Sequence, residues 1–79
     1  MPRISEAVMY TRQGCHLCHN ARELLEAYGI NVREVDIDAQ PELRETYNTC
    51  VPVVEIDGKV RFRGRVDEVL LRRLMVHGT

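Results

Sequence analysis

The sequence contains no long hydrophobic run. No stretch of its 79 residues approaches the roughly 20 consecutive apolar residues that a membrane-spanning helix needs. The opening segment, MPRISEAVMYTR, also lacks the apolar core of a secretory signal peptide. We therefore expect an intracellular, cytoplasmic protein that has no membrane partner.

The sequence also lacks an excess of charge of either sign. Its 11 Lys and Arg residues nearly balance its 12 Asp and Glu residues, and the formal net charge is −1. Binding to a nucleic acid or to a membrane surface through bulk charge needs a clear basic surplus. The composition therefore argues against both classes of partner.

Internal repeats, linkers and low-complexity segments are absent as well. The length leaves no room for a second domain, so we expect one domain over residues 1–79. A domain this small buries only about 60% of the surface of its unfolded chain. Its stability is therefore expected to be modest.

Cysteine is scarce, and the number of cysteines is odd. Two of the three, Cys15 and Cys18, lie within the hexapeptide GCHLCH at residues 14–19. In a reducing compartment this spacing favours redox or metal chemistry over a structural disulfide. Taken alone, the hexapeptide fits a thiol–disulfide pair, a c-type haem attachment or part of a zinc site.

Hydrophobic periodicity predicts alternating strands and helices along the rest of the chain. Asp57-Gly58 favours a tight hairpin, because a type I′ turn needs positive φ at both central positions. A strand, a helix and a strand with short links also predict a parallel pair with a right-handed crossover. The predicted elements are a strand at 6–11, a helix from about 15 to 28, a strand at 30–38, a helix at 40–48, two strands within 51–63 and a helix at 65–78.

Each long helix is expected to bury one apolar stripe against the sheet. The residues that the spacing places on these stripes are Leu17, Ala21, Leu24, Leu25 and Tyr28 in the first helix, and Val66, Val69, Leu70 and Leu74 in the last.

The order of the elements, the length and the Cys-x-x-Cys pair together resemble the glutaredoxins, which are small proteins of the thioredoxin-like superfamily. The resemblance covers nearly the whole chain. It implies an α/β fold of order β-α-β-α-β-β-α, with one four-stranded mixed sheet and helices on both of its faces.

The position of the cysteine pair predicts a division of labour. Cys15 falls at the N-terminus of the first predicted helix, where free N–H groups and the helix macrodipole stabilise a negative charge. That position favours the thiolate, which is the form that attacks a disulfide. Cys18 lies almost one turn later and deeper, so we expect Cys15 to be the nucleophile and Cys18 the resolving thiol. The alternative is a pair of buried, unreactive thiols.

The resemblance assigns a substrate-binding loop to the segment Cys50-Val51-Pro52-Val53. This segment matches the Thr-Val-Pro pattern of glutaredoxins at its Val and its Pro. The match implies a cis Val51–Pro52 bond beside the cysteine pair. It also implies that Val51 offers its backbone groups to an extended thiol substrate, which would bind as an added strand.

Two charged residues are assigned to glutathione by the same resemblance. Arg12 stands where glutaredoxins usually carry Lys, so it is expected near the thiolate or near a carboxylate of glutathione. Asp67 matches the Asp of a Gly-Gly-x-Asp segment that contacts glutathione at the start of the last helix. Asp67 fits the N-cap of that helix equally well.

The activity implied is the reduction of protein disulfides or glutathione mixed disulfides, with no bound cofactor and glutathione as a possible cosubstrate. Two departures from the family pattern weaken the case for glutathione. The pair reads Cys-His-Leu-Cys instead of Cys-Pro-Tyr-Cys, and Arg65 replaces the second Gly. Because some glutaredoxin-like redoxins are served by thioredoxin reductase, the expected partners are a disulfide-containing protein and either glutathione or a reductase of that type. We expect a monomer.

Metal binding on the same scaffold is the main rival hypothesis. Cys15, Cys18 and Cys50, with His16 or His19, could hold zinc or part of an iron–sulfur cluster. Against it, the chain has one cysteine pair, whereas strong zinc sequences have two. Cys50 could also be a third redox thiol or a small apolar filler. Haem attachment would need His19 as an axial ligand.

Overall fold

The structure is a computed structural model that describes residues 5–48 and 50–77. The predicted order of elements is confirmed, with one short 3-10 helix (η1) added after the second strand. The elements are β1 (Glu6–Thr11), α1 (His16–Ala27), β2 (Asn31–Asp36), η1 (Ile37–Ala39), α2 (Pro41–Tyr47), β3 (Val53–Ile56), β4 (Lys59–Arg63) and α3 (Glu68–His77).

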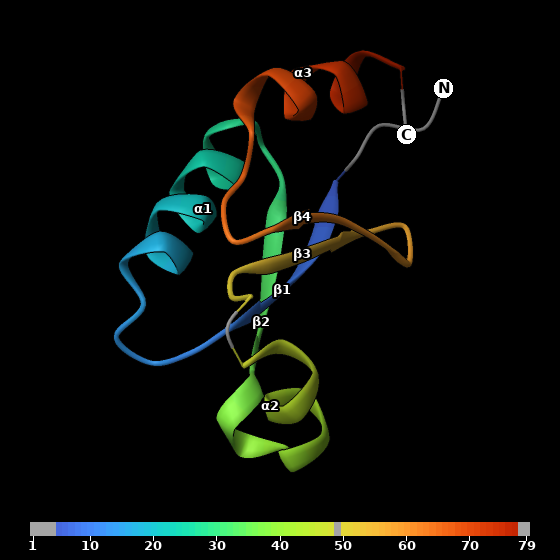
Figure 1. The fold of residues 1–79 in the computed structure, drawn as a ribbon. Coiled ribbons are helices and arrows are strands. Elements are labelled where there is room, and N and C mark those ends of the chain that lie inside the picture. The colour runs from blue at the N-terminus through green and yellow to red at the C-terminus, as the bar shows by residue number, and fades with distance from the viewer. Residues whose placement is uncertain (1–4, 49, 78–79) are drawn as a thin grey trace.

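The four strands form one mixed sheet in the order β2-β1-β3-β4. β1 runs parallel to β2, whereas β1 with β3 and β3 with β4 are antiparallel. The parallel pair needs a crossover, which α1 supplies (Figure 1). The predicted sheet is therefore confirmed, and its centre is the β1–β3 pair.

Local sequence signals explain how α1 ends and how the hairpin turns. Gly29 has a φ of 79° and its N–H donates to the Glu26 carbonyl, so the helix closes with a left-handed residue and β2 begins at once. Asp57 and Gly58 have φ values of 55° and 77°. Both signs are those that a type I′ turn requires, which confirms the predicted hairpin.

The second strand ends earlier than predicted. It stops at Asp36, and Ile37–Ala39 turns into η1 instead of extending the strand to residue 38. The Asp36 side chain accepts a hydrogen bond from the Asp38 N–H at 2.9 Å. Such local pairing competes with the strand ladder and turns the chain.

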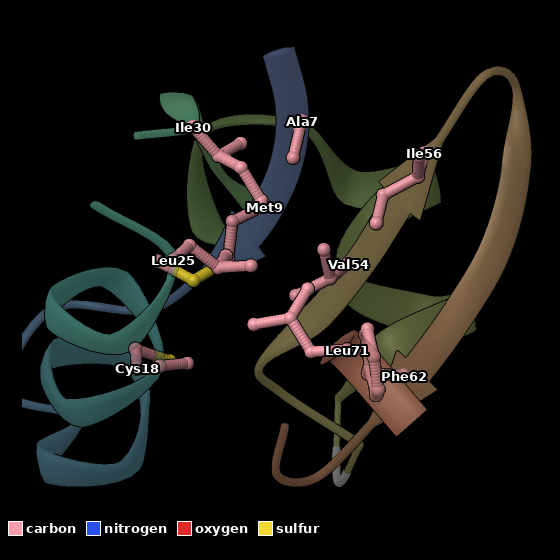
Figure 2. Close-up of a cluster of buried hydrophobic side chains, with 10 residues drawn as sticks. Ala7, Met9, Cys18, Leu25, Ile30, Val54, Ile56, Phe62 and Leu71 are labelled. Atoms are coloured by element: carbon pink, nitrogen blue, oxygen red, sulfur yellow. The ribbon is translucent and has the colours of Figure 1, made fainter. Parts of the chain in front are cut away.

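The main core lies between one face of the sheet and helices α1 and α3 (Figure 2). Alternate residues of β1 and of β3 point to this face, as the pleat requires. On the opposite face, Tyr10 of β1 contacts Tyr47 of α2, with ring centroids 4.9 Å apart. Helices therefore cover both faces. The buried cluster of the main core is Ala7, Met9, Cys18, Ala21, Leu25, Ile30, Val54, Ile56, Phe62 and Leu71.

The predicted buried stripes are wrong at three positions. Leu17, Val69 and Leu70 are 53%, 52% and 46% exposed, whereas Leu71 is fully buried. The last helix begins at Glu68, so Val66 precedes it and cannot set its phase. Within the helix, the spacing of Leu71, Leu74 and Met75 defines the inward stripe. Leu17 lies in the first turn of α1, at the end beside the cysteine pair.

Within the described ranges, none of the helices combines the length and the apolar character needed to cross a membrane.

Candidate active site

Cys15 caps the first helix through its sulfur. It is the N-cap residue of α1, with an extended backbone (φ −88°, ψ 108°), and it is half-buried. Its Sγ accepts a hydrogen bond from the Cys18 N–H at 3.1 Å. The sulfur thus occupies the place of a Ser or Asp oxygen at a helix N-terminus. A negative charge on this atom faces a donor and the positive end of the helix dipole.

A short turn brings Cys15 to this position. The chain leaves β1 at Thr11, and the Cys15 N–H donates to the Arg12 carbonyl at 3.3 Å. Gly14 has a φ of 78°, a conformation that a residue with a side chain rarely adopts. The turn places the sulfur at the carboxyl end of a central strand, next to the first turn of α1.

Cys18 is held inside the core as a neutral thiol. It is only 2% exposed, and burial raises the pKa of its thiol above the usual value, helped by a hydrogen bond with Cys15. Hydrogen bonds from the Thr11 side chain and the Arg12 backbone oppose this pKa rise but are smaller effects. All three cysteines are free thiols in the structure. The half-buried Cys15 is therefore the more accessible sulfur of the pair.

This difference predicts an order of alkylation by iodoacetamide. In the reduced protein at pH 7, Cys15 should be modified first, because Cys18 is buried and its pKa is raised. The ordinary pKa of a cysteine thiol is 9.0, and that of Cys18 lies above it. Cys18 should therefore react appreciably only above pH 9, where its thiol begins to lose the proton in the folded protein. Mass mapping of the modified sites measures both rates. Protein unfolded in urea is the control, in which both thiols react alike. Equal rates in the folded protein at pH 7 would contradict the assignment.

The loop that contains Val51 and Pro52 is anchored to the end of β4. The Val51–Pro52 peptide bond is cis, and Pro52 is buried. The Gly64 N–H donates to both the Cys50 carbonyl (2.9 Å) and the Pro52 carbonyl (2.8 Å). Gly64 reaches them with a φ of 81°. Among the described residues, no backbone partner pairs with the N–H or the carbonyl of Val51.

The side chain of Arg12 reaches toward η1 and the end of α2. Its Nε and Nη2 donate to the two carboxylate oxygens of Asp38 at 2.9 and 3.0 Å. Its Nη1 and Nη2 also donate to the Asn48 carbonyl (3.0 Å) and to Asn48 Oδ1 (2.7 Å). The expected contact of Arg12 with glutathione stays a prediction.

Asp67 caps the last helix, as its sequence position allowed. Its Oδ1 accepts hydrogen bonds from the Val69 N–H at 2.9 Å and the Leu70 N–H at 3.3 Å. The neighbouring Glu68 accepts a hydrogen bond from the Tyr28 hydroxyl at 2.6 Å and so joins α3 to the end of α1. The proposed contact of Asp67 with glutathione also stays a prediction.

Two hollows flank the first turn of α1. A polar hollow of about 680 Å³ includes Arg12, Cys15, His16, His19 and Glu34 in its lining. An apolar groove of about 370 Å³ lies between α1 and the segment before α3. The apolar groove is lined by Leu17, Asn20, Ala21, Leu24, Gly64, Arg65 and Val66. The exposed Leu17 and Arg65 thus border this groove, which lies between the cysteine pair and α3.

The four-ligand zinc site and the haem attachment find no support in this arrangement. Among the described residues, no group of three or more His, Cys, Asp and Glu side chains is placed to hold a metal ion. The proposed set of Cys15, Cys18 and Cys50 therefore does not form a ligand cluster. Haem attachment would require an accessible Cys18 sulfur, but Cys18 is buried in the core. His19 pairs with Glu23 at 3.3 Å.

Sequence reasoning missed the contacts of Arg12 with Asp38 and Asn48. It also missed that the Gly64 N–H binds two carbonyls of the Pro52 loop. Asp38 and Asn48 lie 26 and 36 positions from Arg12. No local spacing marks such pairs, because only the tertiary fold brings them together. The positive φ of Gly64 had a signal, namely its Gly identity directly after a strand.

The chain matches known proteins over nearly its whole length. A family model described as the glutaredoxin-like domain matches residues 6–75. A glutaredoxin-like protein of Dictyostelium discoideum is 35% identical over 69 residues, a match that covers 75% of this chain and 64% of that relative. The matched part is thus less than two thirds of that relative's length.

Solved structures show the same fold. The protein XcR50 from X. campestris superposes with a TM-score of 0.76 at 29% identity, covering 90% of this chain and 96% of that one. The glutaredoxin-like NrdH-redoxin from Escherichia coli superposes with a TM-score of 0.68 at 26% identity, covering 87% and 93%. That redoxin is described as having a thioredoxin-like activity profile.

Proposed function

The chain belongs to the glutaredoxin-like family, and from this premise we propose that it is a thiol–disulfide oxidoreductase that works through Cys15 and Cys18. Its substrates would be protein disulfides or glutathione mixed disulfides. Its partner would be a disulfide-containing protein, and no bound metal or organic cofactor would take part. The protein would act as a monomer, because one chain carries both thiols. The compartment would be the reducing cytoplasm, where the thiols can be regenerated.

One observation supports this proposal above the others. The Cys18 N–H points at the Cys15 sulfur from 3.1 Å, while the Cys18 thiol lies buried behind it with a raised pKa. A nucleophile needs a stabilised anion and access to substrate. A resolving thiol needs to stay protonated and hidden until a mixed disulfide has formed in front of it. The capping position of Cys15 and the burial of Cys18 support these two roles.

The proposed reaction has two exchange steps. The Cys15 thiolate attacks one sulfur of the substrate disulfide, a Cys15–substrate disulfide forms, and the other substrate sulfur leaves as a thiolate that takes up a proton. Cys18 then loses its proton and attacks the Cys15 sulfur, which forms the Cys15–Cys18 disulfide and releases the second substrate thiol. The substrate gains two electrons from the protein and two protons, one released by Cys18 and one from the solvent, which took up the Cys15 proton when the thiolate formed.

The electron donor that restores the thiols is either glutathione or a reductase of the thioredoxin-reductase type. Val51, Pro52 and Asp67 would contact glutathione by analogy with the family. Arg65 in the apolar groove and the likeness to the E. coli redoxin favour the second donor. Reduction of the Cys15–Cys18 disulfide takes two electrons and two protons, which two molecules of glutathione or one dithiol supply.

A glutathionylated peptide tests the proposal. Wild-type protein with glutathione and glutathione reductase should consume NADPH, and Cys15→Ser should reduce turnover to the uncatalysed rate. If wild type is inactive there, thioredoxin reductase with insulin as substrate is the second assay, and Cys15→Ser is again the control. Activity only in the second assay assigns the dithiol donor. No activity in either assay, or equal activity in Cys15→Ser, would refute the proposed function.

A further inference from the structure

The side chain of Arg12 has almost no capacity left for a ligand. A guanidinium carries five N–H donors. Four of its donations go to Asp38 and Asn48, at 2.7–3.0 Å. The pair with Asp38 is bidentate, which fixes the orientation of the planar guanidinium as well as its position. A substrate carboxylate could therefore not receive the usual two-pronged contact from Arg12 without breaking this set of bonds.

The same residue touches both halves of the candidate site. Its backbone carbonyl accepts from the Cys15 N–H, so it belongs to the turn that presents the nucleophile. Its side chain holds Asn48, three positions before Val51. Figure 1 shows the loop that leaves β1 passing beside the end of α2. Arg12 is therefore a direct link between the nucleophile's turn and the chain that enters the Pro52 loop.

The Pro52 loop is thus held at its two sides by different contacts. Gly64 binds the Cys50 and Pro52 carbonyls from β4, and the Cys50 N–H donates to the Tyr47 carbonyl at 3.0 Å at the end of α2. Among the described residues, the bonding of Arg12 to Asn48 and Asp38 is a side-chain attachment toward Cys15, and it adds to the sheet pairing of Val53 with Tyr10 of β1. Loss of that attachment would leave the loop tied to β4, to α2 and, through Val53, to β1, but would free its entry at Asn48 from the turn that carries Cys15.

We infer that Arg12, together with Asp38 and Asn48, is a positioning device that sets the Pro52 loop at a fixed place relative to Cys15, and is not a ligand of the substrate. The inference rests on the proposed function, in which Val51 of that loop pairs with the substrate. The hydrogen bonds from Arg12 also lower the pKa of the Asp38 carboxyl, so Asp38 is charged at neutral pH and keeps the bidentate geometry.

Asp38→Asn separates positioning from direct binding, because Asp38 lies in η1 and lines neither of the two hollows beside the cysteine pair. The amide keeps the shape of the side chain but replaces one acceptor oxygen with a donor that opposes the guanidinium. With a peptide disulfide, we expect KM to rise roughly tenfold and kcat to change much less, which is the expected effect of a displaced binding loop. Arg12→Met should give a similar change. The double variant should be no worse than either single one, because both act through one unit.

Conservative and matched variants complete the test. Asp38→Glu, which restores the charge, should recover part of the lost kcat/KM. Glu45→Gln removes an exposed carboxylate from α2 and should match wild type. If Arg12→Met weakens activity while Asp38→Asn behaves like wild type, Arg12 acts on the substrate directly and the inference is overturned.

Amide hydrogen exchange gives a readout that does not depend on turnover. In Asp38→Asn and in Arg12→Met, the Cys50 and Gly64 amides should exchange faster, whereas the Leu71 amide of α3 should not change. Unchanged exchange at Cys50 and Gly64 in both variants would overturn the inference even in an inactive protein. Inactivity of wild type, by contrast, would count against the proposed function alone.

Discussion

Cys18→Ser is expected to stop the reaction at the mixed disulfide. The Cys15 thiolate should still attack a protein disulfide, but no thiol would remain behind it to release the substrate. The variant should therefore accumulate a covalent adduct, and multiple-turnover reduction of insulin should fall at least 100-fold, toward the rate seen when a nucleophilic thiol is absent. Mass spectrometry detects the adduct, and dithiothreitol releases it.

Cys50 provides the matched control for this experiment. It is a free, half-buried thiol close in sequence to Pro52, and Cys50→Ser should turn over without trapping substrate. If Cys50 can resolve the mixed disulfide, Cys18→Ser will not accumulate the adduct until Cys50 is also replaced. That result would move the resolving role from Cys18 to Cys50 and contradict the proposed second exchange step.

Leu71→Ala is expected to remove a large share of the folding free energy. Leu71 is fully buried in the main core, and such truncations cost about 2–5 kcal/mol. A domain of 79 residues has a total stability of roughly 4–12 kcal/mol at 0.05–0.15 kcal/mol per residue. The variant should therefore unfold at much lower urea concentration, or be partly unfolded without denaturant.

The neighbouring Leu70→Ala is the matched control. Leu70 is 46% exposed, so the same chemical change should alter the unfolding free energy by no more than about 0.5 kcal/mol. Circular dichroism in a urea series measures both variants under one set of conditions. Equal losses at the two positions would show that α3 packs through a different face.

These two leucines illustrate where sequence reasoning fails. The order of the elements, the hairpin and the cysteine pair follow from local signals, such as the positive φ required at Asp57 and Gly58. The inward face of α3 does not, because its phase depends on where the helix begins. Starting the stripe at Val66 places Leu70 inside, whereas the real start at Glu68 places Leu71 there.

In the candidate site, too, some residues can be predicted from local signals and others depend on the tertiary fold. Cys15 and Cys18 are recognisable because both lie at one strand-to-helix junction, and the structure shows the expected difference in burial. Arg12 stands out in the sequence only for its charge beside Cys15. Its partners Asp38 in η1 and Asn48 after α2 could not be inferred, since only the tertiary placement of these two elements brings them to it. Long-range side-chain hydrogen bonds leave no periodic trace in a sequence.

The place of β3 in the sheet has a consequence for a chain that is still being synthesised. β1 and its helix emerge first, but the central pairing with β3 needs residues 53–56, more than half the chain later. Until then, Cys15 and Cys18 have no opposing loop at Val51 and no complete core behind them. On the proposed function, a nascent chain would therefore carry both thiols before the Val51 loop that is proposed to bind the substrate has reached its place beside them.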